Sequence, residues 1–490
     1  MTEVDYSRKW WVMLAVAMGI FLGTIDGSIV NVALPTLVAD LDTTFPVVQW
    51  VVLAYLLVLA TLVLGVGRLG DIVGKKPIYA AGFAVFTLGS VLAGLSPSVG
   101  WLIGFRIFQA VGAAMVFALG FAIITEAFPP HERGRALGLN GAIVSVGIVL
   151  GPTLGGILID TLGWRWIFFV NLPIGIAGTL TAIRYVPDVP PRGGERFDFV
   201  GAGVFLVMLL AFMLGLTFGQ TRGFGDPLPL GLLALAAVAL PLFIRIERFV
   251  EHPVLDLSLF RDRLLSVNLF AGWASFAAIG GVFILLPFYL ENVLGYSPMA
   301  TGLLLASAPL ALGVSAPISG SISDRVGPWP VILVGLSVLL LGYLLMMTLD
   351  TRTTAIGYLL TLIPVGLGMG IFQSPNNSAV MGSVPGHRLG VTSGLLTITR
   401  ITGQLSGISV LGAVWAARVA AHAGARGEPS AASAAAQAAG LRETMIVSAA
   451  LVGISLALAA WGRLSPRSRP GRSPVGPRRP AGSPEGPSRG

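Results

Sequence analysis

Residues 67–77 read GRLGDIVGKKP, and residues 320–330 read GSISDRVGPWP. In each stretch a glycine is followed four residues later by an aspartate, Asp71 or Asp324, and three residues after that by another glycine. Each stretch is a short polar turn between two long apolar runs. The second half of the chain therefore echoes the first, and repeated halves around a central cavity are typical of secondary transporters.

The composition excludes a soluble enzyme. Of 490 residues, 54% are hydrophobic and 11% are charged, whereas soluble domains carry about 25% charged residues. The chain has no cysteine, which excludes disulfides and cysteine-ligated metals. We expect no metal site, because the four histidines lie in polar stretches without an HExxH motif. The net charge of +8 indicates basic cytoplasmic loops rather than binding to nucleic acid.

Apolar runs long enough to cross a bilayer fill most of the chain. A membrane-spanning helix needs about 20 apolar residues, and barrel strands of about ten alternating residues are not seen. The sequence predicts an all-α membrane protein with 14 transmembrane helices, near 11–35, 47–69, 77–97, 99–125, 136–160, 166–186, 199–219, 228–246, 264–290, 299–322, 329–349, 354–376, 390–415 and 443–462.

The domain organisation follows from the repeat. We expect a six-helix bundle in residues 1–186, a linker with two inserted helices in 187–263, a second, pseudo-symmetric six-helix bundle in 264–464 and a disordered basic tail in 465–490. Residues 417–440 are expected to form an outer loop that is partly helical.

The distribution of basic residues predicts the orientation. An even number of spans leaves both termini on one side. With that side inside, 23 Arg and Lys residues are cytoplasmic and 6 are external, as the positive-inside rule requires. We therefore expect a multi-pass protein of the bacterial plasma membrane with both termini in the cytoplasm.

Charged residues within spans are costly and normally face a cavity or a partner. Asp26 is the best candidate for a proton carrier. The helical rise counted from the outer ends of their spans places Asp26 and Arg106 at similar depth in the outer half, so they are expected to pair across one cavity. The alternative for Arg106 is a fixed structural pairing. Glu126, near the inner end of its span, is expected to be interfacial, with a role in proton coupling as the alternative, and Glu291 is expected to be solvated.

Several motifs occur in one order along residues 10–465. They include IDGSIVNVALP from residue 25, RIFQAVGAA from 106, GIVLGPTLGG from 147, WRWIFFVNLPIG from 164, EHPVLDLSLFR from 251 and NVLGYSPMATG from 292. With GRLGDIVGKKP, they resemble the fourteen-helix drug:proton antiporter branch of the major facilitator superfamily. The chain departs from that pattern at Ser28, where Thr is usual, and in the second-half loop, which lacks the basic pair.

Two of these motifs suggest roles in the transport cycle. The first loop is predicted to be a cytoplasmic gate in which Asp71 meets a neighbouring arginine, with a simple topology anchor as the alternative; its residues are Gly67, Gly70, Asp71, Gly74, Lys75, Lys76, Arg133 and Arg135. The second is predicted to form a flat helix face that seals an antiporter against leak, as the resemblance implies, with ordinary packing as the alternative; its residues are Gly147, Gly151, Pro152, Gly155 and Gly156.

Polar and aromatic residues within spans are candidates for a substrate cavity, and interfacial or packing positions are the alternative. The candidates are Asn31, Gln49, Tyr55, Gln109, Gln373, Asn377 and Arg400. Sparse polar groups among aromatics suit lipophilic substrates, and cation–π contacts suit cationic ones.

The sequence thus predicts an efflux antiporter for lipophilic small molecules such as drugs or antibiotics. No GxxxxGK[ST] motif is present, so an ion gradient is expected to drive transport, with protons as the coupling ion and no cofactor. No nucleophile–base–acid set indicates an enzyme. The alternatives are a lipid or metabolite exporter, an uptake symporter and a non-transporting sensor or scaffold. We expect a monomer in the lipid bilayer and leave an accessory efflux partner open.

Overall fold

The computed structural model describes residues 8–129, 132–188, 198–250, 262–384, 389–424 and 427–464. These residues form helices and short connections, without a strand among them. Fourteen helical segments are long and apolar enough to cross a membrane, so the predicted fold class is confirmed. The predicted tail 465–490 and the EHPVLDLSLFR stretch lie outside the described residues, as do the side chains of Asp71, Arg133 and Arg135.

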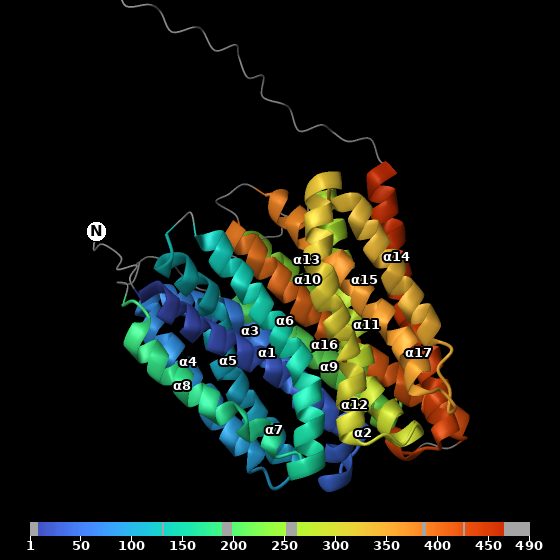
Figure 1. Ribbon diagram of the computed structural model, residues 1–490. Coiled ribbons are helices and arrows are strands. Elements are labelled where there is room, and N and C mark those ends of the chain that lie inside the picture. The colour runs from blue at the N-terminus through green and yellow to red at the C-terminus, as the bar shows by residue number, and fades with distance from the viewer. Residues whose placement is uncertain are drawn as a thin grey trace, which may run out of the picture.

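The first half contains six membrane crossings and two one-turn helices (Figure 1). Its helices are α1 (Lys9–Asp40), α2 (Phe45–Val48), α3 (Trp50–Val73), α4 (Lys75–Gly94), α5 (Val99–Ala127), α6 (Arg133–Leu162), α7 (Trp166–Phe169) and α8 (Asn171–Tyr185).

Two inserted helices and six further crossings follow. The inserted helices are α9 (Phe199–Arg222) and α10 (Pro227–Phe249). The second half consists of α11 (Arg263–Phe288), the π-helical turn η3 (Tyr289–Val293), α12 (Pro298–Leu305), α13 (Ser307–Val326), α14 (Pro328–Met346), α15 (Ala355–Gly382), α16 (Leu389–Ala423), the 3₁₀ turn η5 (Pro429–Ala431) and α17 (Ala434–Leu464).

The two halves form separate groups of helices, blue to light green for the first half and yellow to red for the second in Figure 1. In the first group α1 packs against α5, α6 and α8, and in the second α11 packs against α16 and α17. Helix α9 contacts both α3 and α16, so it spans the boundary between the groups. We call the end at which α1 begins and α17 ends the terminal end, and the opposite end the distal end.

The repeated loops share a conformation that explains their glycines. Gly74 ends α3 with φ +105°, and Gly327 ends α13 with φ +85°. Side chains rarely adopt positive φ because Cβ is crowded there, so glycine is favoured at both helix ends. The sequence repeat thus marks the same sharp helix–helix turn in each half.

The expected outer loop is partly helical. Within residues 417–440, α16 continues to Ala423 and α17 begins at Ala434. The alanines that make this stretch weakly apolar are also the strongest helix formers, so both flanking helices extend beyond their hydrophobic cores.

Candidate functional site

Asp26, near the middle of α1, is the centre of a buried hydrogen-bond cluster. Its Oδ2 accepts a hydrogen bond from Nη1 of Arg106 at 2.5 Å. Its Oδ1 accepts from Nε2 of Gln109 at 2.8 Å and from Nδ2 of Asn171 at 3.2 Å. Both amides also donate to Oγ of Ser90, at 2.6 Å and 3.0 Å. All five side chains are buried, with at most 1% exposure. The carboxylate is therefore shielded from solvent, and it accepts hydrogen bonds from three donors.

Arg106 is fixed by further contacts. Its Nη1 also donates to Oε1 of Gln109 at 2.7 Å, and its Nε donates to the carbonyl of Val51 at 3.1 Å. The guanidinium lies 4.2 Å from the centre of the Tyr55 ring, a cation–π distance. The predicted pairing of Asp26 with Arg106 is confirmed. Helix α3, which carries Val51 and Tyr55, also contacts the arginine.

Within the cluster, the charges of Asp26 and Arg106 compensate each other. Removing one partner of a buried ion pair costs about 3–5 kcal/mol, because it leaves the other charge without compensation in a medium of low dielectric constant. A proton that reached Asp26 would neutralise one partner of this pair and remove the attraction that holds Arg106. The attraction within the pair therefore depends on both partners keeping their charges.

The location of the cluster corrects one expectation. Asp26, Arg106, Ser90 and Asn171 belong to α1, α5, α4 and α8, which all lie in the first half. The sequence suggested a pair across one cavity; the acid is instead enclosed among buried side chains of the bundle to which both residues were assigned. The reason is that side chains of α4, α5 and α8 fill the space around Asp26.

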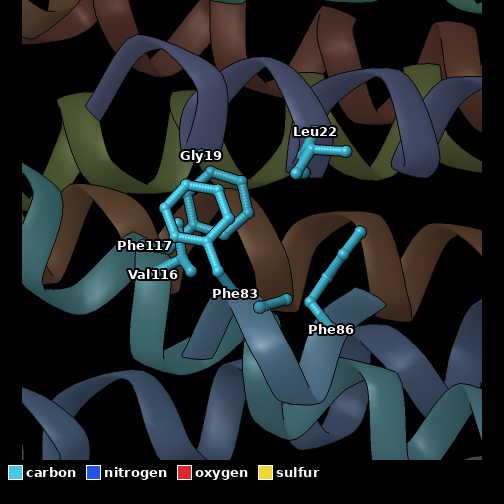
Figure 2. A pocket seen from close by; sticks show the side chains of 8 residues that line it. Gly19, Leu22, Phe83, Phe86, Val116 and Phe117 are labelled. Carbon is cyan, nitrogen blue, oxygen red and sulfur yellow. The ribbon is translucent and has the colours of Figure 1, made fainter. Parts of the chain in front are cut away.

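A small apolar pocket lies next to the cluster, one helical turn toward the terminal end. Leu22, Phe86 and Ala113 are each four residues from Asp26, Ser90 and Gln109 on their own helices. Figure 2 shows the aromatic rings that crowd this hollow, which has room for about one water molecule. Its lining is Gly19, Leu22, Gly23, Phe83, Phe86, Ala113, Val116 and Phe117. No polar side chain lines it, so it offers no partners for a water chain from the terminal end to Asp26.

The opposite face of α1 forms a close seam with α6. A Cβ at Gly147 would collide with Thr24, and one at Gly151 would collide with Ser28. A Cβ at Gly155 would lie 2.7 Å from Ile29. The predicted flat stripe is therefore confirmed as a packing surface, and its partner is the helix that carries Asp26.

The same motif also contacts the second half. A Cβ at Gly156 would collide with the carbonyl of Pro298, and one at Gly302 would collide with the carbonyl of Pro152. Helices α6 and α12 thus meet backbone to backbone near the distal end, and this contact is possible only without side chains.

Phe45 closes the distal end between the two halves. Its ring lies 4.7 Å from Trp415 and 5.1 Å from Phe288, centre to centre, in edge-to-face arrangements. Its backbone N–H donates to Oε1 of Glu428 at 2.8 Å. Phe45 and Phe288 are fully buried, and Trp415 is nearly so. An aromatic side chain of the first half is therefore inserted into a socket of the second half.

Helix α9 adds to this closure. Nε2 of Gln49 donates to Oε1 of Gln220 at 3.1 Å, and Nε1 of Trp50 donates to Oγ1 of Thr217 at 3.1 Å. The inserted helix pair is thus attached to the first half at the distal end.

The expected cavity residues divide into two groups. Gln49, Tyr55 and Gln109 are buried, since they belong to the distal closure or to the Asp26 cluster rather than to an open cavity. Asn31, Gln373 and Arg400 are partly exposed, and Asn377 is exposed. Glu291, expected to be solvated, has one buried carboxyl oxygen because it lies in η3, beside the contact between the halves.

The first repeated loop is only partly as predicted. Gly70 lies against Leu119 of α5, but a Cβ at Gly67 would meet nothing within 4 Å, so the close approach expected there is absent. Lys75 pairs with Glu126 at 2.5 Å, which joins α4 to α5. Lys76 is partly exposed.

At the terminal end, ion pairs join parts of the same half. Lys9 at the start of α1 pairs with Glu132 just before α6 at 2.6 Å, and the Lys75–Glu126 pair also lies within the first half. The direct contacts between the halves described above lie toward the distal end. This structure is therefore a distally closed state.

Residues 16–408 match the family model of the Major Facilitator Superfamily. The chain belongs to this superfamily of membrane transporters. It is 38% identical over 395 residues to the riboflavin transporter RibZ of Clostridioides difficile, covering 80% of this chain and 85% of that relative. It is 36% identical over 413 residues to the multidrug resistance protein Stp of Mycobacterium tuberculosis, covering 83% and 75%.

A third relative of this transporter is the tetracenomycin C resistance and export protein of Streptomyces glaucescens, 31% identical over 418 residues, covering 84% of this chain and 77% of that relative. The fold resembles that of a bacterial homologue of the human lysosomal transporter Spinster, with a TM-score of 0.65 and 18% identity, covering 92% of this chain and 96% of that structure. The transporter is a multi-pass membrane protein of this fold.

Ser90 and Asn171 are the site residues that the sequence interpretation missed. Asn171 lies in WRWIFFVNLPIG, which was noted only as a motif. Ser90 follows an ordinary apolar stretch, so no sequence signal distinguishes it from a serine that bonds its own helix.

Proposed function

We propose that this transporter exports lipophilic small molecules from the bacterial cytoplasm in exchange for protons. The single observation that carries this proposal is the buried Asp26–Arg106 pair, with its partners in the interior of a membrane-spanning bundle. A scaffold has no need for a buried acid, because charges in the bilayer interior are costly. An acid that a single proton can neutralise is what a proton-driven cycle requires.

The seam between α1 and α6 supports a route from the proton to the gate. Asp26 lies on one face of α1, and Thr24 and Ser28 on another face touch the glycine stripe of α6. The end of α6 meets α12 of the second half. A change of charge at Asp26 alters how α1 sits against α5 and α8, and α6 transmits that change to the contact between the halves.

The orientation follows the distribution of basic residues. We place the terminal end in the cytoplasm and the distal end outside, so the closed end is the external one. Each proton that enters carries about 2.3 kcal/mol per 100 mV of membrane potential. Exchange of one proton for one uncharged substrate thus sustains a substrate gradient of roughly fiftyfold at that potential, whereas a singly charged cation exchanged for one proton draws only on the pH gradient. Protons are the coupling ion, no cofactor takes part, and the monomer is the working unit.

Export of drugs or antibiotics is favoured by the names of two relatives, a multidrug resistance protein and a tetracenomycin C resistance and export protein. Transport of a polar aromatic metabolite is the second candidate, because a riboflavin transporter is the relative with 38% identity.

Drug susceptibility in a bacterial host without its own pumps separates these functions. Cells that produce the wild type should resist several lipophilic cationic compounds, and cells that produce Asp26→Asn at the same level should not. Asp40→Asn is the matched control, since Asp40 is an exposed aspartate at the end of the same helix. Riboflavin flux without any change in resistance would instead support the metabolite transporter.

A further inference from the structure

Asn171, the first residue of α8, has one half of its amide in use and the other half free. Its Nδ2 donates to Asp26 Oδ1 at 3.2 Å and to Ser90 Oγ at 3.0 Å. Its Oδ1 is buried and has no hydrogen-bond partner. A buried polar atom without a partner costs about 1–3 kcal/mol, so the free oxygen calls for an explanation.

The hydrogen bonds around Asp26 suit a carboxylate and not a carboxylic acid. An ionised carboxylate only accepts hydrogen bonds, and Asp26 receives them from Arg106, Gln109 and Asn171. A protonated carboxyl group carries one O–H that must donate. The neutral form therefore needs an acceptor that the charged form does not.

The acceptors within the cluster are mostly occupied. Gln109 Oε1 already accepts from Arg106, and Ser90 Oγ already accepts from two amides. Asn171 Oδ1 is the acceptor without a donor. A half-turn of the Asn171 amide about its last side-chain bond exchanges Nδ2 and Oδ1, which would bring the free oxygen to Asp26.

The charged and titratable groups near Asp26 are few. Arg106 on α5 is the cation, and Tyr55 on α3 packs against that cation. Helices α4 and α8 contribute the neutral groups Ser90 and Asn171. Arg106 has no acceptor to offer, so the response to a proton rests on the amides.

We propose that Asn171 is a positioning residue for the proton step, whose amide donates to Asp26 when that side chain is charged and turns to accept its O–H when it is protonated. This inference rests on the proposed role of Asp26 as the proton carrier. The proton comes from solvent and remains on Asp26, so no other bond forms or breaks. The amide lowers the cost of the neutral state, which otherwise buries an unsatisfied O–H group.

Infrared difference spectra between high and low pH on the reconstituted protein test this inference. The wild type should gain a carboxyl band on acidification that is missing in Asp26→Asn. A side-chain amide band should shift at the same pH, and this shift should be missing in Asn171→Leu. Asn268→Leu is the matched control, because Asn268 on α11 is also buried with a partnerless Oδ1 and lies in the other half; it should keep the amide shift.

Exchange of substrate for protons in proteoliposomes gives a second readout. Asn171→Leu should slow it about tenfold, as expected when one buried donor loses its acceptor, while Asn268→Leu stays within twofold. Asn171→Thr, which keeps a donor and an acceptor, should recover part of the rate and guards against a folding defect in the leucine variant.

The outcomes distinguish two failures. If the Asp26 carboxyl band appears but no amide shift accompanies it, or if the shift survives in Asn171→Leu, Asn171 has only a structural role and this inference is overturned. If the wild type shows no carboxyl band that depends on Asp26, the acid does not titrate, and the proposed function fails together with the inference.

Discussion

Replacing Phe45 with alanine is expected to weaken the distal closure while leaving both halves folded. Phe45 is fully buried and makes two edge-to-face ring contacts, both with residues of the second half. When the distal end opens, this ring leaves its socket. Burial of a phenylalanine side chain contributes about 1.5–3 kcal/mol, and an aromatic pair adds about 0.5–1.5 kcal/mol.

The closed state should therefore lose about 3 kcal/mol relative to the open state, which is roughly a 150-fold shift in their ratio. The matched control is Phe205→Ala. Phe205 is also buried and pairs with Phe243 at 5.3 Å, but that contact joins α9 to α10 and does not join the halves.

Spin labels at the distal end measure the shift. The chain has no native cysteine, so Thr44→Cys and Ala435→Cys, two exposed positions on opposite halves, can be labelled specifically. The distance distribution should acquire or enlarge a longer component in Phe45→Ala and stay as in the wild type in Phe205→Ala. Identical distributions in the two alanine variants would refute the assignment of Phe45 as the residue that holds the distal end shut.

Three further changes probe the gate, the seam and the ion pair. Glu428→Ala should also raise the ratio of the open to the closed state, by roughly tenfold, since a hydrogen bond to a charged group contributes about 1.5–3 kcal/mol. An unchanged distance distribution would argue against a role for this carboxylate. Gly151→Leu should abolish transport, because its side chain would enter α1, whereas Gly104→Leu, where a Cβ meets nothing within 4 Å, should transport normally; equal transport rates would mean that the seam is not required. Arg106→Ala should lower the melting temperature and stop exchange more completely than Arg106→Lys, because it leaves a buried carboxylate unpaired at a cost of about 3–5 kcal/mol; thermal melts in detergent with equal losses for both variants would contradict this account.

The fold was predictable because its determinants are regular. Fourteen apolar runs and short breaks define the crossings, and Gly74 and Gly327 mark the same turn in both halves. The Asp26–Arg106 pair was also predictable, since both helices have a constant rise per residue and the depth of a charge follows from counting.

The residues that surround the Asp26–Arg106 pair could not be predicted as readily from the sequence. Which face of α1 meets α4 and α8 depends on how whole helices pack, and α1 is apolar on nearly every side. For this reason Gln109 was assigned to a substrate cavity, although it lies in the Asp26 cluster. Asn171 and Ser90 became site residues only through contacts across 145 and 81 positions of sequence.

The distal closure was not predictable at all. Phe45, Glu428 and Trp415 come from one short helix, one loop and one long helix, and each is ordinary in its own context. Their meeting depends on how the two halves pack against each other. A state in which the halves part at this end has the same sequence and different neighbours.

The most direct test of the central claim is substrate-induced proton release in proteoliposomes that contain the wild type, Asp26→Asn or Asp40→Asn. The account predicts that a lipophilic cationic drug releases protons from the wild type and from Asp40→Asn, and that Asp26→Asn still binds the drug but releases none. Proton exchange by Asp26→Asn at the wild-type rate would contradict the account, and Glu126, paired with Lys75 at the terminal end, would be the next acid to examine.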